Sequence, residues 1–302
     1  MKNQTMARDH DAIGGRRDAL GATSGRTLVV DGVRLAYDDD GAGPPVVCLH
    51  AIGHGAGDFA GLSAHLRSRY RVLALDWPGH GRSAADTVPA SAARYADLLV
   101  GLLEALRLAP AILIGNSIGG AAAVRVAAAH RDRVRALVLE NPGGCDRVDP
   151  LARLVTGTMA RFFAAGARGA WWYPRAFAAY YRMVLPAAAA APQRARIVAA
   201  GRESAPVLAE AWRSFGRAEA DQRDLLPAIT CPVLIAWAER DRVLQLRRNL
   251  PGLQRLARMR LVRFAAAGHA AHLETPERFA SELDAFLGEL GDENLTALAQ
   301  AQ

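Results

Sequence analysis

Short apolar runs without polar alternation recur along the chain, and they constrain its fold more than any other feature. Four of them are VVCLH (46–50), VLALD (72–76), AILIG (111–115) and VRALVLE (134–140). A strand that is apolar on both sides has to be covered on both faces of its sheet, which is typical of parallel sheets. Helical patterns fill the intervals between these runs. The alternation predicts an α/β fold with a doubly wound, mostly parallel sheet.

The remaining segments add four strands, which makes a sheet of eight, and one helical insertion between two of the strands. TLVVDGVRLAYDDDG (27–41) reads as two strands joined by an Asp-Gly turn, and PVLIAWA (232–238) and MRLVRF (259–264) add two more strands. Residues 144–228 show helical patterns without a convincing strand. We therefore predict a core of residues 26–143 and 229–290, an inserted helical cap of residues 144–228, a flexible N-terminal tail (1–25) and a C-terminal tail (291–302).

A G-x-S-x-G pattern lies between the strand at 111–115 and an alanine-rich helix. Its residues are Gly115, Asn116, Ser117, Ile118 and Gly119. A serine on such a tight turn has a strained backbone, and small residues two positions away let strand and helix approach each other. The helix N-terminus then points the Ile118 N–H toward developing negative charge. This placement predicts that Ser117 is a catalytic nucleophile.

A serine nucleophile needs a base that a carboxylate holds in place, and both candidates follow later predicted strands. Asp241 follows the strand at 232–238, and His269 follows the strand at 259–264. Together with Ser117, each lies beyond the carboxyl end of a parallel strand, where open α/β sheets place their sites. The order along the chain is serine, acid, histidine.

These motifs together resemble the α/β-hydrolase fold superfamily over roughly residues 27–290. The motifs that carry the resemblance are LHAIGHGAGDF (49–59), LDWPGHGRS (75–83), GNSIGG (115–120), PVLIAWAERD (232–241) and GHAAHLETPERF (268–279). The resemblance implies a nucleophile at Ser117, a general base at His269 and an orienting acid at Asp241. It also implies an oxyanion hole made by the N–H groups of Ile118 and Ile52. The chain departs from the family's usual His-Gly at 50–51, where it has His-Ala.

Other acids and histidines compete for these roles. Glu239 is a rival acid two residues before Asp241, and Glu140 is a lesser one at the end of the strand at 134–140. His272 is a rival base, and we expect it to pack near Glu274 or to line the site. We expect His50 to be structural. We expect a solvated loop position for His54, with an approach to substrate as the alternative.

Serine at position 117 suits acyl transfer through an acyl-enzyme, whereas dehalogenases and epoxide hydrolases of this fold use aspartate there. We therefore predict a serine hydrolase that acts on carboxylic esters of small or medium acyl compounds. One alternative is a C–C bond hydrolase of ring-cleavage diketo-acids. Asn141-Pro142-Gly143-Gly144 partly matches a Gly-Pro-Gly-Gly of those relatives, but Ala270 stands where they usually have tryptophan. A second alternative is a non-catalytic ligand-binding protein, because fold does not fix function.

Several classes of protein are disfavoured. We expect no metal, because the chain shows no His, Cys and Asp cluster with ligand spacing. We expect no cofactor, because no lysine follows GNSIGG as a phosphate-binding loop would require. Three scattered cysteines, no apolar leader and no apolar run long enough to span a bilayer favour a cytoplasmic protein.

The net charge of +7 is concentrated in the predicted cap. Residues 144–228 hold 12 arginines against 7 acidic residues, and 150–202 hold eight arginines and no acidic residue. A solvated face is one reading. A second is that the arginines attract an anionic small-molecule substrate with an apolar body. A third, less favoured, is peripheral contact with anionic lipid. We expect no nucleic acid partner, because the catalytic motifs account for the rest of the chain.

Overall fold

The computed structural model describes residues 25–108 and 110–300, so the predicted N-terminal tail lies almost wholly outside the described residues. An eight-stranded sheet has the order β1-β2-β4-β3-β5-β6-β7-β8. β1 and β2 are antiparallel to their neighbours, and the pairs from β4 to β8 are parallel. The doubly wound, mostly parallel sheet is thereby confirmed. The strands are β1 (Arg26–Val30), β2 (Val33–Gly41), β3 (Pro45–Leu49), β4 (Arg71–Leu75), β5 (Ala111–Asn116), β6 (Val134–Glu140), β7 (Val233–Ala238) and β8 (Met259–Phe264).

The predicted hairpin at the start of the sheet turns over two residues. Val30 pairs with Val33, and both loop residues have positive φ, 45° at Asp31 and 77° at Gly32. Two positive φ values define the hairpin turn whose twist matches that of the flanking strands. The Asp-Gly pair therefore sets the register of β1 against β2.

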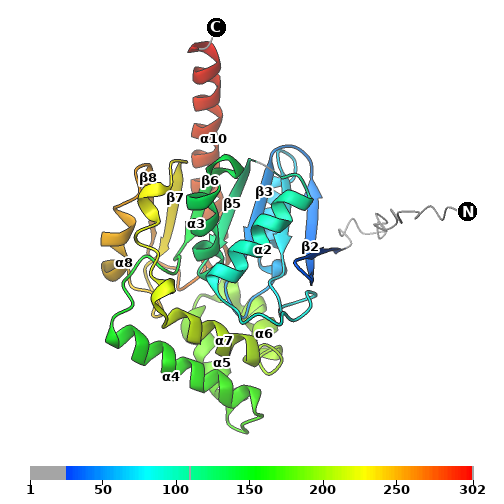
Figure 1. Cartoon of the computed structure of the whole chain (residues 1–302), viewed down its shortest axis with the longest axis vertical. Coiled ribbons are helices and arrows are strands. Elements are labelled where there is room, and N and C mark those ends of the chain that lie inside the picture. Colours follow the sequence, from blue (N-terminus) through cyan, green and yellow to red (C-terminus); the bar gives the residue numbers. More distant parts are fainter. Residues whose placement is uncertain (1–24, 109, 301–302) are drawn as a thin grey trace, which may run out of the picture.

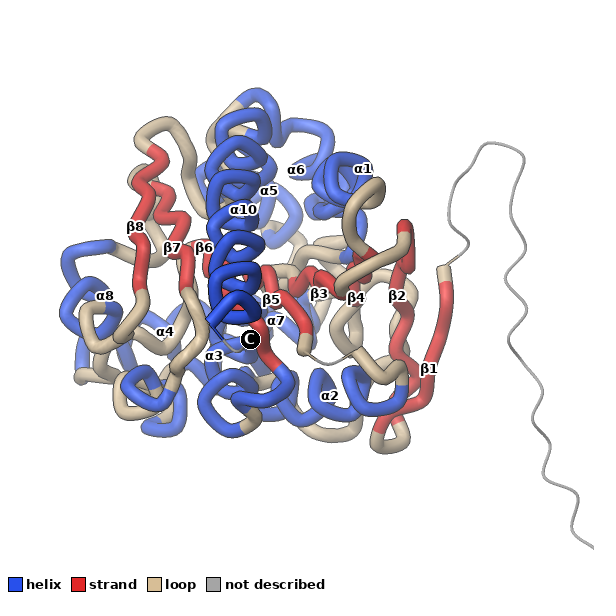
Figure 2. The backbone as a smooth tube through the Cα atoms, turned by 90° about the horizontal axis from the view of Figure 1, so that it is seen from above, coloured by secondary structure: helices blue, strands red, loops and turns tan. Residues whose placement is uncertain are grey.

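Helices cover both faces of the sheet (Figures 1 and 2). α2 and α3 pack on one face, where Leu98, Leu102 and Val124 are buried. α1 and α10 pack on the other, where Leu66, Phe279 and Leu283 are buried. Both faces are apolar, as the unbroken apolar runs predict. The helices of this core are α1 (Ala60–Leu66), α2 (Ala92–Ala105), α3 (Ile118–Ala129), α8 (Leu246–Leu253), α9 (Ala271–Glu274) and α10 (Pro276–Gln300).

Two helix boundaries differ from the prediction. α10 continues to Gln300, whereas the sequence pattern ended this helix at 290 and assigned the rest to a tail. The segment after Gly291 contains leucine, alanine and glutamate and no proline, so nothing in it stops a helix. The helical pattern in the sequence extends over about 245–258, whereas α8 ends at Leu253, two residues after Pro251.

Residues 144–228 form the helical insertion, between β6 and β7. Its helices lie together beyond the end of the sheet where β6 ends (Figure 1). The first begins at Pro150, after an Asp149 side chain that accepts the Ala152 N–H, a typical helix N-terminus. The four helices are α4 (Pro150–Ala167), α5 (Tyr173–Val184), α6 (Ala191–Ala199) and α7 (Ala205–Phe215).

Aromatic side chains form the interior of the helical insertion. Phe163 of α4 lies 6.2 Å from Phe177 of α5 and 6.1 Å from Trp212 of α7, measured between ring centroids. All three rings are buried, and they belong to the same apolar cluster as the face of the sheet that α2 and α3 cover. The helical insertion and the core therefore share one continuous interior.

Candidate active site

Ser117 stands at a tight turn between β5 and α3. Its φ of 55° and ψ of −114° lie outside the regions that non-glycine residues ordinarily adopt. A Cβ on Gly115 would lie 2.6 Å from the Gly120 nitrogen, and one on Gly119 would lie 2.2 Å from the Leu49 carbonyl oxygen. Glycine is therefore required at both positions, as the G-x-S-x-G pattern predicts.

A buried hydrogen-bond pair joins Asp241 and His269. Asp241 Oδ2 lies 2.7 Å from His269 Nδ1, and the side chains are 1% and 6% exposed. Burial disfavours the charged imidazolium, but the attraction and hydrogen bond of the Asp241 carboxylate outweigh it, so the pKa of His269 is raised. The ring is thus held at Nδ1 and leaves Nε2 for other chemistry.

Three further donors fix the Asp241 carboxylate. Its Oδ1 accepts the N–H groups of Val243 (2.7 Å) and Leu244 (3.0 Å). Its Oδ2 accepts the Asn141 amide at 2.7 Å. Asn141 also bonds both backbone groups of Ala238 and has a φ of 38°. Asparagine is among the few residues that adopt this conformation readily, so Asn141 connects the end of β6 to the acid.

Asn116 brings the Ser117 and His269 segments side by side. Its Nδ2 donates to the His269 carbonyl oxygen at 2.9 Å and to the Glu140 carbonyl oxygen at 3.0 Å. In the part of the chain that the structure describes, no hydrogen bond joins the Ser117 hydroxyl to the His269 ring. Such catalytic contacts are often long without substrate and shorten when it binds.

The loop after β3 and the start of α3 carry the two predicted oxyanion donors. Ile118 is the first residue of α3, so its N–H has no acceptor within the helix. In the loop after β3, Gly53 has a positive φ of 80°, and Ala51 does not have a positive φ. Alanine at 51 is therefore compatible with this backbone.

Two buried histidines support the loop that contains Ile52. His50 Nε2 accepts the Trp77 N–H, and His80 Nε2 accepts the Gly53 N–H, each at 2.9 Å. Burial lowers the pKa of both rings, that of His80 to about 3. His50 thus has the structural contacts that the sequence predicts.

Glu274 connects the His269 loop to the helical insertion, and its contacts were not predicted. Its Oε1 accepts the N–H groups of Gly268 (2.8 Å), His269 (2.9 Å) and Ala270 (3.3 Å). Its Oε2 accepts the Ala187 N–H at 3.0 Å. The only local signal for Glu274 is its position five residues after the predicted base.

The rival residues have other partners. Glu239 pairs with Arg263 at 2.6 Å, away from His269. Glu140 pairs with His272, whose Nδ1 lies 2.9 Å from one carboxylate oxygen and 3.0 Å from the other. His272 lies two residues before Glu274 in α9, where its ring binds Glu140 while the Glu274 oxygens bind backbone N–H groups. His269 thus pairs with Asp241, and His272 pairs with Glu140.

The expectation that His54 lies at a solvated loop position is wrong. The His54 ring is 1% exposed, and its Nδ1 lies 2.5 Å from Asp58 Oδ2. Tyr181 of α5 lies against it, with ring centroids 5.7 Å apart. The loop pattern did not reveal this burial, because the covering side chain comes from the helical insertion.

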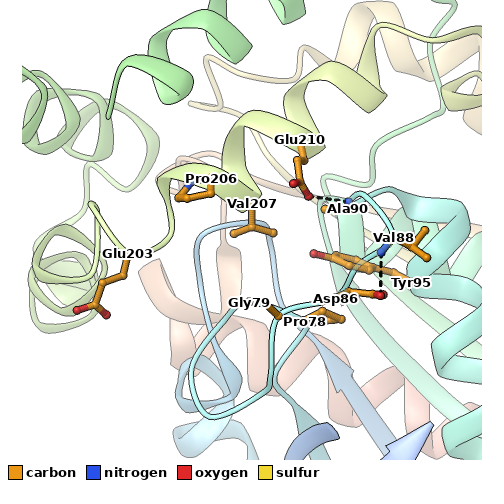
Figure 3. A pocket seen from close by; sticks show the side chains of 11 residues that line it. Pro78, Gly79, Asp86, Val88, Ala90, Tyr95, Glu203, Pro206, Val207 and Glu210 are labelled. Carbon is orange, nitrogen blue, oxygen red and sulfur yellow. Dashed lines mark hydrogen bonds between the residues drawn. The ribbon is translucent and has the colours of Figure 1, made fainter. Parts of the chain in front are cut away.

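A small cavity lies between α7 and the loops that follow β4 (Figure 3). Its volume is about 190 Å³, and Ser117, Asp241 and His269 do not line it. The Glu210 carboxylate accepts the Ala90 N–H across it at 3.2 Å. This contact attaches α7 to the segment before α2.

Comparison with known proteins identifies the family. The model of the alpha/beta hydrolase fold family matches residues 44–276, so the chain belongs to this family. It is 30% identical, over 88% of its length and 94% of the relative's, to a 2-hydroxymuconate semialdehyde hydrolase of Pseudomonas sp. (strain CF600). The resemblance noted in the sequence is thereby confirmed.

Solved structures share the fold. An esterase from Thermogutta terrifontis has a TM-score of 0.75 and 23% identity, with 88% of this chain and 99% of that one covered. An enol-lactonase from Burkholderia xenovorans has a TM-score of 0.72 and 24% identity, with 87% and 100% covered. These structures show the shared fold, and the family model and the Pseudomonas relative show a hydrolase family.

Two absences hold for the residues that the structure describes. None of their helices combines the length and the apolar character that a membrane span requires. No group of three or more of their His, Cys, Asp and Glu side chains is arranged to hold a metal ion.

Proposed function

We propose that the protein is a serine hydrolase in which Ser117, His269 and Asp241 form a catalytic triad. The observation that carries this proposal is the strained backbone of Ser117 between β5 and α3. Such a conformation costs about 1–3 kcal/mol and persists where the surrounding structure enforces it. The Asp241–His269 pair, at 2.7 Å, supplies the base that a serine nucleophile needs.

The proposed reaction proceeds through an acyl-enzyme. The Ser117 oxygen attacks the substrate carbonyl carbon while His269 Nε2 takes the hydroxyl proton. Asp241 stabilises the resulting imidazolium through Nδ1. The N–H groups of Ile118 and Ile52 bind the oxyanion. The imidazolium then protonates the leaving group, and the neutral ring activates the water that releases the acid.

We further propose that the helical insertion is a cap over this site and that the substrate is a carboxylic ester with a small or medium acyl group. Two contacts support the cap. The Tyr181 hydroxyl donates to the Ile52 carbonyl oxygen at 3.3 Å, and Ala187 bonds Glu274. The helical insertion therefore contacts the loop of Ile52 through a side chain and the loop of His269 through a backbone N–H.

A second candidate is hydrolysis of a C–C bond. The relative named 2-hydroxymuconate semialdehyde hydrolase favours it, since the likeness spans nearly the whole of both chains. Ala270 and Asn141 depart from the pattern of such enzymes, and Asn141 is occupied in holding Asp241. We therefore rank ester hydrolysis first.

Two assays test these proposals. We expect Ser117→Ala to lower kcat on p-nitrophenyl esters by about 10⁴-fold or more. Ser63→Ala, which alters a hydroxyl of α1, is the matched control. A fluorophosphonate probe should label Ser117 and should fail with His269→Ala. Undiminished ester hydrolysis by Ser117→Ala would refute the triad.

Rates measured on two kinds of compound distinguish the two candidate substrate classes. Esters of graded acyl length test the first candidate, and 2-hydroxymuconate semialdehyde tests the second. Turnover of the semialdehyde alone, lost in Ser117→Ala, would establish the C–C bond hydrolase. A wild-type protein that hydrolyses neither and resists the probe would support the non-catalytic alternative.

A further inference from the structure

Exposed apolar side chains concentrate on one part of the helical insertion. Seven large apolar side chains are strongly exposed in the part of the chain that the structure describes, and five of them lie between 151 and 172. Isolated exposed apolar residues are normal, but a contiguous patch usually marks an interaction site. The five, with their exposed fractions, are Leu151 (58%), Leu154 (64%), Val155 (49%), Trp171 (82%) and Trp172 (37%).

A strip of mostly apolar side chains follows one side of α4 and includes Leu151 and Val155. Leu151, Val155, Thr158 and Phe162 follow at spacings of four, three and four residues, so they share one side of the helix. Phe162 continues the strip onto the next loop, because its ring centroid lies 5.9 Å from that of Trp172. The strip therefore extends from the first turn of α4 to the two tryptophans.

Arginines border this strip without acidic partners. Leu154, Arg161 and Arg168 repeat every seven residues and lie along one edge of α4, beside the strip. Both arginines are exposed, and Arg175 is exposed just after the tryptophans. Within the described ranges, these three arginines make no ion pair, although many arginines of the core do. Their charge is thus available to an outside partner.

The position of α4 leaves the surface accessible. Figure 1 shows α4 as the element farthest from the sheet, at the opposite end of the molecule from the end of α10. A flat partner can therefore approach along the length of α4. Tryptophan and leucine beside arginine, on one exposed side, is the composition of helices that lie in the boundary of an anionic bilayer.

We propose that the outer side of α4 and the Trp171–Trp172 loop dock the protein on an anionic lipid bilayer. The arginines contact lipid phosphates while Leu151, Leu154, Val155 and the two tryptophans enter the boundary between headgroups and acyl chains. An acidic protein surface would satisfy the arginines but would leave the apolar strip exposed to water.

The strip also leads toward the proposed catalytic residues. Phe162 lies 6.3 Å from Tyr180 of α5, measured between ring centroids. Burial raises the pKa of the Tyr180 hydroxyl, and the charge of the Asp241 carboxylate raises it further. Docking would thus bring the bilayer against the side of the helical insertion that connects to the site.

Vesicle binding tests the proposal with a matched pair of variants. We expect the full-length protein to co-sediment with vesicles containing phosphatidylglycerol and to remain in solution with phosphatidylcholine alone. Leu154→Glu should weaken binding at least tenfold. Val29→Glu is the control, because Val29 is also 64% exposed but lies on β1. Both sites are exposed, so both variants should fold, as circular dichroism will verify.

A second pair of variants tests how much the arginines contribute to vesicle binding. Replacing Arg161 and Arg168 by glutamine should weaken binding about fivefold per arginine, and salt should weaken binding of the wild type. The control replaces Arg107 and Arg131 by glutamine, since both are exposed and lie far from α4 in the sequence. Equal loss in the two double variants would reduce the effect to net charge and overturn the proposed surface.

Tryptophan emission reports insertion directly. Trp77, Trp212 and Trp237 are at most 7% exposed, so a blue shift on adding anionic vesicles would come from Trp171 and Trp172. The double variant Trp171→Phe, Trp172→Phe should show no shift. Absence of vesicle binding would overturn the proposal. Equally tight binding to heparin without a blue shift would also overturn it, in favour of an acidic macromolecule.

Discussion

Acid should weaken the fold through a histidine behind the proposed oxyanion loop. His80 accepts the Gly53 N–H at Nε2, and its Nδ1 lies 2.9 Å from the Pro78 carbonyl oxygen. A protonated ring carries hydrogen on both nitrogens and cannot accept the bond from Gly53. Burial and the neighbouring His50 lower the pKa of His80 to about 3. We therefore predict that stability falls between pH 6.5 and about pH 5, before most carboxylates titrate.

The magnitude follows from proton binding. Between pH 6.5 and about pH 5, His80 becomes protonated in the unfolded chain but stays neutral in the folded chain. The free energy of unfolding therefore decreases as the pH is lowered. The fall is about 1.4 kcal/mol per pH unit for one histidine, or about 2 kcal/mol between pH 6.5 and about pH 5. His50, whose pKa is also lowered, adds a loss of the same sign. His269 and His272 have raised pKa values, so they are protonated in both states below pH 6.5.

Denaturant unfolding across this range measures the slope. His80→Gln keeps an acceptor for Gly53 but removes the titration, so its slope should be shallower by about 1.4 kcal/mol per pH unit. A wild-type stability that does not change between pH 6.5 and about pH 5 would refute the reasoning. Equal slopes for the wild type and His80→Gln would refute it as well.

Three further predictions concern the site. Gly119→Ala should destabilise the fold by about 3 kcal/mol in denaturant unfolding, because its Cβ would meet the Leu49 carbonyl oxygen at 2.2 Å; Gly61→Ala, with nothing near its Cβ, should not. Glu274→Gln should cost about 2 kcal/mol in the same assay, because four N–H groups lose a charged acceptor, and it should also lower kcat. The kcat/KM for ester hydrolysis should rise with pH through a pKa above 6.5, since His269 must be neutral to accept a proton and its pKa is raised; a midpoint below 6.5 would contradict the Asp241 contact.

Local patterns predicted the sheet well. The runs at 134–140 and 259–264 match β6 and β8 at both ends, because apolar residues and turn signals bound each strand on its own. The Ser117 turn was predictable for the same reason, since its steric requirements fall on residues two positions away. Such features depend on neighbours in the sequence, and the sequence displays those neighbours directly.

The supports of the site were not predictable in this way. Asn141 holds an acid 100 positions later, and Glu274 binds Ala187, 87 positions earlier. Neither contact leaves a local pattern, because the partner comes from another part of the chain. His54 was misjudged for the same reason, since Tyr181 covers it from the helical insertion. A single sequence therefore predicts a local turn such as that of Ser117 better than the side chains from distant segments that support it.

Glu274 also limits how the protein can be recombined. One carboxylate binds the loop of His269 through three N–H groups and the helical insertion through the Ala187 N–H. An insertion transplanted from a relative would have to present a free backbone N–H at position 187. Proline there would leave a buried carboxylate oxygen without its donor. Replacement of the helical insertion by that of a relative is therefore compatible with this core only when the relative keeps that backbone N–H.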